Sequence, residues 1–156
     1  MAGALERFRA EAARRGVEVD VREFPRGTRT ASDAARAVGC DVGQIVKSLV
    51  CTAGEEPFLA LTAGSNRADL RRLAGIIGAA EVRMANAEEA RGATGYAIGG
   101  TPPFGHPRPL RTLVDRDLLA HEVVWAAAGT PSTVFPIRPT DLLEVTNGEV
   151  VDLKEG

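Results

Sequence analysis

The sequence predicts a single α/β domain over residues 1–156, with one mixed, strongly curled β-sheet and helices packed around it. The chain has 156 residues, 44% of them hydrophobic, which is enough to bury one core. Apolar residues alternate with a period of two in some segments and follow helical spacing in others. These segments are mixed without a regular strand–helix–strand rhythm, and short turns join several neighbouring strands. The sheet is therefore expected to be mixed rather than purely parallel.

Helices are expected where a capping residue precedes a helical hydrophobic pattern. Thr30 can cap a helix that Gly39 ends, and Ser65 can cap a longer one that ends at Gly78. Asn86 with Glu89 has the spacing of a capping box. The expected helices are 4–15, 29–39, 66–78, a short one from Asn86 to Gly92, a turn at 116–120, and 139–146.

Strands are expected where β-branched and other apolar residues alternate or form short runs. The clearest alternation is that of Val17, Val19 and Val21. The expected strands are 17–24, 44–51, 55–62, 111–115, 122–127, 132–137 and 149–153.

The composition excludes several function classes. The net charge is −2, so any nucleic acid would be held by a local patch rather than by bulk positive charge. Cys40 and Cys51 have no metal-ligand spacing, and with only two histidines a metal site is not expected. No apolar run approaches the ~18 residues that span a bilayer. The N-terminus is charged and lacks a signal-peptide core, which predicts a cytoplasmic protein with reduced thiols.

Lys47 stands out because the chain otherwise uses arginine almost everywhere. The chain has 19 basic residues, and its only lysines are Lys47, within the apolar segment QIVKSLVC, and Lys154 near the C-terminus. Lys47 could extend to solvent or pair with a nearby carboxylate. Alternatively, its compact ammonium group could bind a phosphate or a carbonyl oxygen in a pocket.

Residues 97–115, AIGGTPPFGHPRPLRTLVD, form an unusually stiff connection. Gly99 and Gly100 could present successive backbone amides to an anion or a developing oxyanion. Pro102 and Pro103 would hold the shape of that loop. The alternative is a stiff connection at the edge of the sheet. His106 could be a general base, a ligand contact, or a surface residue that caps a carbonyl group.

A second small-residue segment, Gly129–Thr133, follows the expected strand 122–127. It could form the opposite wall of a pocket, or it could be a tight hairpin turn. Three arginine groups could be solvated surface or phosphate contacts: Arg67 with Arg71 and Arg72, Arg26 with Arg29, and Arg108 with Arg111.

Several known catalytic motifs are absent from the sequence. AGSNR lacks the second glycine of a nucleophile elbow, and neither a Walker-type loop nor a His-Glu-x-x-His motif occurs. Asp33, Asp69, Asp115 and Asp117 are scattered, and helix caps and strand ends account for most of them.

Three segments together resemble the YbaK/ProX (YbaK/EbsC) family of aminoacyl-tRNA deacylases, which is related to the editing domain of bacterial prolyl-tRNA synthetases. They are TRTASDAARAVGCDVGQIVKSLV, TGYAIGGTPPFGHPRPLRTLVDRDLL and AAGTPSTVFPI. The most specific pieces are the lysine in IVKSLV and the loop GGTPPFGH. The resemblance covers nearly the whole chain and implies one α/β domain with a mixed, barrel-like sheet surrounded by helices.

The resemblance also implies a reaction and a site. The reaction is hydrolysis of the ester of a mischarged tRNA by water or by the substrate's own thiol, with no cofactor and no metal. Lys47, Gly99 and Gly100 match the family's catalytic positions. The candidate substrate-binding residues are Thr30, Ser48, Thr101, Pro102, His106, Gly129 and Ser132.

The sequence therefore predicts a trans-editing enzyme whose partner is the acceptor end of a mischarged tRNA. A small amino acid such as Ala, Cys, Ser or Thr is expected, and an aminoacyl-tRNA synthetase is a candidate second partner. No acidic residue in GTPSTVFPI matches that of the family's cysteine-specific members, so the amino acid is left open. The alternatives are a non-catalytic module that binds a tRNA end or small metabolite, and a hydrolase of another small ester or amide.

Overall fold

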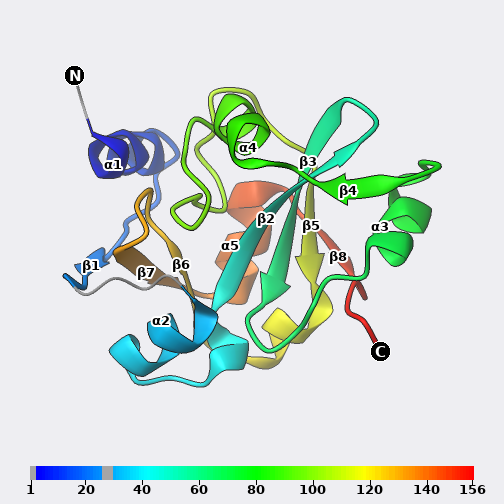
Figure 1. Ribbon diagram of the computed structural model, residues 1–156. Helices are drawn as coiled ribbons and strands as arrows, with labels where there is room; N and C mark the ends of the chain where they lie inside the picture. The colour runs from blue at the N-terminus through cyan, green and yellow to red at the C-terminus, as the bar shows by residue number, and fades with distance from the viewer. Residues whose placement is uncertain (1–2, 26–29) are drawn as a thin grey trace.

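The computed structural model describes residues 3–25 and 30–156, which fold into two β-sheets and five α-helices (Figure 1). The larger sheet has five strands in the order β4-β2-β3-β5-β8, and the smaller has three in the order β1-β7-β6. The strands are β1 (Arg22–Glu23), β2 (Val46–Ala53), β3 (Glu56–Ala63), β4 (Val82–Met84), β5 (Thr112–Asp115), β6 (Val124–Ala127), β7 (Thr133–Ile137) and β8 (Glu149–Val151).

The larger sheet is mixed, as predicted. β2 and β3 form an antiparallel hairpin whose turn contains Gly54 with φ of 64°. β5 pairs parallel to β3, and β8 pairs parallel to β5. This arrangement confirms the predicted α/β class with a mixed sheet.

The two sheets meet at one isolated bridge, a parallel pair between Ile45 and Trp125. Among the described residues the strands do not close into a complete barrel, so the barrel-like curl consists of two sheets joined at this bridge. On the far edge, β4 pairs with Cys51–Ala53 only, and the Ala85 N–H bonds the Val50 carbonyl. In the part of the chain that the structure describes, the edge of β2 from Lys47 to Leu49 therefore has no strand partner.

The predicted strand 17–24 is mostly wrong. Only Arg22 and Glu23 pair with β7, while Val17, Val19 and Val21 are half-buried against the core without a strand assignment. The alternation correctly showed which side is buried. A period of two requires only one buried face, and does not by itself supply a neighbouring strand.

Four of the helices begin and end close to the predicted positions. The helices are α1 (Ala4–Arg14), α2 (Ala31–Val38), α3 (Leu70–Ile77), α4 (Ala87–Thr94) and α5 (Pro139–Thr146), with short 3₁₀ helices η1 (Val42–Gln44) and η2 (Arg116–Ala120). Thr30 caps α2, and Asn86 forms the capping box of α4 with Glu89.

The exception is α3, because Ser65 does not cap it. The helix begins four residues later, after Asp69, whose carboxylate accepts the N–H groups of Arg71 and Arg72. A carboxylate is a strong acceptor at a helix N-terminus, so Asp69 rather than Ser65 is the N-cap of α3. Ser65 and Asn66 are left in a connection between β3 and α3.

The two faces of the larger sheet carry different clusters. Val46 and Val50 of β2 pack into the main cluster with residues of α1, α4, α5 and the smaller sheet. Tyr96 and Phe104 of the connection after α4, and Ala128 after β6, belong to the same cluster. Leu49 and Cys51 pack with α3 in a second cluster. In Figure 1, α1 and the smaller sheet lie on one side of β2, and α3 lies on the other, next to β4. Over the described residues, no helix is both long and apolar enough to cross a membrane.

Candidate active site

Lys47 lies near the start of β2, opposite Thr62 of β3. Its ammonium group donates a hydrogen bond to the Asn66 carbonyl, with an Nζ···O distance of 2.5 Å. Burial lowers the pKa of Lys47 below its ordinary value, the Asp115 carboxylate opposes that change, and Arg67 acts in the same direction as burial. The side chain is thus half-buried, bound to a carbonyl oxygen, and within the field of a carboxylate.

A polar network holds the Asn66 turn in place. Asp115, 1% exposed at the end of β5, accepts the Ala63 N–H at 3.0 Å and the Asn66 side-chain amide at 2.8 Å. The same amide also donates to Asp117 at 2.8 Å. Sequence reasoning missed Asn66 and treated Asp115 as a strand-end residue. Nothing in the sequence spacing shows that positions 47, 66 and 115 meet.

The glycine loop packs directly on the second small-residue segment. A Cβ atom added to Gly100 would lie 2.8 Å from the Thr130 backbone and 2.9 Å from the Gly129 carbonyl oxygen. The Gly100 N–H is already used, because it donates to the Ala97 carbonyl at 3.0 Å, and the Thr101 hydroxyl donates to the same oxygen. Gly99 has φ of 89°, and no hydrogen bond within residues 3–25 and 30–156 uses its N–H.

His106 is buried, so the interpretation of a surface histidine is wrong. Its Nε2 lies 2.8 Å from the Pro102 carbonyl oxygen, as expected for a residue that caps a carbonyl group. Because a carbonyl only accepts, Nε2 carries the proton. Burial lowers the pKa of His106, Arg15 lowers it further, and the bond to Pro102 partly offsets both. This geometry gives His106 a structural part in fixing the loop.

The lowered pKa of His106 predicts a pH dependence of stability. Above about pH 6.5, the ordinary value for histidine, the imidazole is neutral in both folded and unfolded chains. Below that pH the unfolded chain binds a proton that the folded chain resists, so the free energy of unfolding falls as pH falls. We expect urea unfolding to show this loss between pH 7.5 and 5.5, and His106→Gln to reduce it. An identical pH dependence in both proteins would contradict this assignment.

The remaining predicted residues have varied environments. Thr30 is exposed, and its hydroxyl accepts the Asp33 N–H. Ser48 alternates with Lys47 on β2, so its side chain lies on the main-cluster face, and its buried hydroxyl has no hydrogen-bond partner among residues 3–25 and 30–156. The Ser132 carbonyl accepts the Phe24 N–H, and its hydroxyl lies 3.4 Å from that of Thr130.

The structure therefore brings these residues together in two separate groups. One contains the glycine loop and residues 129–132, and the other contains Lys47, Asn66 and Asp115. Because the Ile45–Trp125 bridge is parallel, β2 and β6 leave it in the same direction. The open edge from Lys47 to Leu49 and the loop that follows β6 thus lie on the same side of the bridge.

The arginine groups are mainly surface ion pairs. Arg67 lies 3.4 Å from Glu155, and Arg72 lies 2.8 Å from Asp152. Arg111 pairs with Glu149 at 2.8 Å. Arg26 and Arg29 lie outside the described residues.

Residues 25–145 match the family model of the aminoacyl-tRNA editing domain. The chain belongs to this family. EbsC of Enterococcus faecalis, described as a candidate Cys-tRNA(Pro)/Cys-tRNA(Cys) deacylase, is 26% identical over 80% of this chain and 76% of its own. The Ser/Thr-tRNA deacylase ProXp-y of Escherichia coli is 29% identical over 74% of this chain and 72% of its own.

A solved structure has nearly the same fold as this editing domain. A crystal structure described as a candidate trans-editing enzyme for prolyl-tRNA synthetase superimposes with a TM-score of 0.94 and 45% identity, covering 100% of this chain and 99% of that one. The proline–tRNA ligase of Streptococcus thermophilus is 28% identical over 85% of this chain, but the match covers only 23% of that enzyme.

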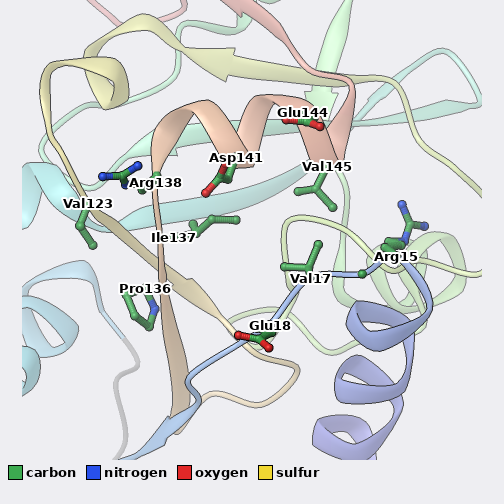
Figure 2. A pocket seen from close by; sticks show the side chains of 11 residues that line it. Arg15, Val17, Glu18, Val123, Pro136, Ile137, Arg138, Asp141, Glu144 and Val145 are labelled. Carbon is green, nitrogen blue, oxygen red and sulfur yellow. The ribbon is translucent and has the colours of Figure 1, made fainter.

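The editing domain also has an open pocket of about 980 Å³ (Figure 2). Its walls are the end of α1, residues 16–18, the end of β7 and one side of α5. Apolar side chains such as Val17 and Ile137 line it, with Asp141 and Glu144 of α5 beside them. None of the predicted site residues lines this pocket.

Removal of the Glu144 charge tests whether the substrate binds in this pocket or at the predicted site. Glu144 is exposed and lines the pocket, and no ion pair of the described residues includes it. If substrate binds near the glycine loop, Glu144→Gln should leave the deacylation rate within about twofold of wild type, since surface substitutions usually have small effects. Steady-state deacylation kinetics measure this. A large loss of kcat/KM would move the substrate site to this pocket.

Proposed function

We propose that this editing domain hydrolyses the ester bond of a tRNA mischarged with a small amino acid. The general activity, aminoacyl-tRNA deacylation, follows from membership of the family. The proposal adds to this general activity the small size of the amino acid and the roles of Lys47 and the glycine loop. One relative is described for Cys-tRNA and another for Ser/Thr-tRNA, which supports a small substrate side chain.

The observation that carries the proposal is the contact between the two loops. The glycine loop rests on Gly129 and Thr130, and the Gly99 N–H has no hydrogen-bond partner among the described residues. Residues 102 and 103 are both proline, which limits how far the loop can relax. A fixed N–H of this kind can stabilise the negative charge that develops on the ester carbonyl oxygen. Gly99 is therefore the proposed donor, and Gly100 allows the close approach that fixes it.

Lys47 is proposed to anchor the acceptor end of the tRNA. It lies at the unpaired edge of β2, and its ammonium group has three N–H donors, so it can bind an oxygen of the substrate while it keeps the bond to the Asn66 carbonyl. A hydrogen bond to a charged group contributes about 1.5–3 kcal/mol. An aminoacyl ester is intrinsically labile, so modest binding and one oriented donor suffice.

A panel of charged tRNAs tests the proposal. We expect at least one of tRNAs charged with alanine, cysteine, serine or threonine to lose its amino acid faster with the protein than in buffer. The release of radiolabelled amino acid measures this. Uncharged tRNA should compete, whereas a hydrolase of other small esters would be indifferent to it. Binding of tRNA without turnover would instead support a non-catalytic module, and the enzyme proposal would fail.

A further inference from the structure

Asn66 and Asp115 lie beside Lys47 and have no role in the reaction proposed above. The Asn66 carbonyl accepts the only hydrogen bond that Lys47 makes through its ammonium group among the described residues. The Asn66 side chain is in turn bound to Asp115 and Asp117 at 2.8 Å each. The position of the acceptor for Lys47 therefore depends on two carboxylates that do not bond Lys47 themselves.

The Asp115 carboxylate is fixed more strongly than a strand end requires. It accepts three N–H groups: the backbone amides of Ala63 and Asp117 and the side-chain amide of Asn66. At 1% exposure it is screened little by water, so its charge acts on nearby groups more strongly than a surface carboxylate would. A buried carboxylate costs stability unless it is paired or bonded.

The turn that carries Asn66 is also tightly packed at Gly64. A Cβ atom at Gly64 would lie 2.8 Å from the Ala31 side chain and 3.2 Å from that of Ile45. The Gly64 N–H donates to the Ile45 carbonyl at 2.7 Å. The turn is thus packed at Gly64 against η1, α2 and the start of β2, while Asn66, two residues further on, is held by its bonds to Asp115 and Asp117.

From these contacts we infer that Asp115, acting through the Asn66 turn, is a positioning residue for the Lys47 ammonium group. This inference rests on the proposed function, in which Lys47 binds the substrate. Asp115 holds the acceptor that aims the ammonium group, and its charge favours the protonated form that can bind an oxygen of the substrate. Asp115 itself does not touch the substrate.

Several charged groups act on Lys47, and a test of Asp115 must separate its effect from theirs. Asp115 and Arg67 act on it directly, in opposite directions. Asp117 accepts the Asn66 side-chain amide, and Lys154 pairs with Asp117 at 2.8 Å and is also within the field of Asp115. Removal of the Asp115 charge should therefore lower the pKa of Lys47, because burial and Arg67 would remain unopposed.

Because the chain has only two lysines, the pKa of Lys47 can be measured without substrate. With ¹³C-labelled lysine, NMR should show two side-chain signals, and Lys154→Arg assigns the one from Lys47. We expect Asp115→Asn to lower the pKa of Lys47 and to reduce kcat/KM for the edited tRNA. A misplaced binding group can cost on the order of a hundredfold. The matched control is Asp152→Asn, which removes a carboxylate paired with Arg72 and Arg116 and should leave the Lys47 signal and the rate unchanged.

Asn66→Ala covers the case in which Asp115→Asn does not fold. It keeps the backbone carbonyl and removes only the tether, and it should change the Lys47 shift and lower kcat/KM with the protein still folded. An unchanged Lys47 signal and rate in folded variants would overturn the inference, even if their stability fell. The failure of the proposed function looks different: wild-type protein would deacylate nothing, while the Lys47 signal would still report whether Asp115 positions it.

Discussion

Gly100→Ala is expected to lower deacylation by about a hundred- to a thousandfold, the typical cost of losing one oriented oxyanion donor. The added methyl group would lie 2.8 Å from the Thr130 backbone, which is too close for contact without movement. The glycine loop and the 129–131 segment must then separate, and the Gly99 N–H moves with them. Because backbone atoms lie on both sides, no side-chain rotation can relieve the clash.

Gly75→Ala is the matched control for this variant. Gly75 lies within α3, and a Cβ atom there would meet no heavy atom within 4 Å. Alanine also favours the helix, so stability should rise by about 0.4–1 kcal/mol while the deacylation rate stays unchanged. Single-turnover deacylation of the edited tRNA and thermal unfolding measure both effects. A Gly100→Ala protein that folds and turns over at the wild-type rate would contradict the role of the loop.

Lys47→Ala is expected to reduce kcat/KM by about ten- to a hundredfold, since one charged hydrogen bond is worth about 1.5–3 kcal/mol. The loss should appear mainly in KM if the ammonium group only anchors the acceptor end. The half-buried side chain leaves little core to disturb, so the variant should remain folded.

Substitution by arginine distinguishes a compact ammonium group from positive charge in general. Lys47→Arg keeps the charge but places a planar fork where the Asn66 carbonyl and the substrate would meet, so it should recover little activity. The same substitution at the other lysine, Lys154→Arg, keeps the surface pair with Asp117 and should be neutral. Full activity of Lys47→Arg would show that the charge alone matters.

The sequence predicted local structure best where one residue decides it. Thr30 and the Asn86–Glu89 pair cap their helices as expected, because a side-chain oxygen at an N-terminus needs no distant partner. The strand at 17–24 was overpredicted because pairing depends on β7, more than a hundred residues away in the chain. Ser65 and Asp69 are both good caps, and only the course of the connection after β3 selects Asp69.

The candidate site was predictable in part for the same reason. Lys47 stood out as a lysine in an apolar segment of an arginine-rich chain, and the glycines of the two loops marked a close approach. Their partners could not be predicted, because Asn66 and Asp115 reach Lys47 through the pairing of β3 with β2 and β5. The occupied Gly100 amide was likewise invisible, since the hydrogen bond to Ala97 depends on how the loop turns.

The N-terminal helix sets a practical limit on how short this protein can be made. α1 lies before residue 25, where the family match begins, yet its Phe8 ring packs 5.2 Å from Phe104 and 5.0 Å from Phe135. The Ala4 carbonyl oxygen also lies only 2.8 Å from the position that a Cβ atom of Gly129 would take. A fragment trimmed to 25–145 would keep every residue of the proposed site and lose the wall behind both loops. Expression boundaries and affinity tags should therefore leave the first helix intact.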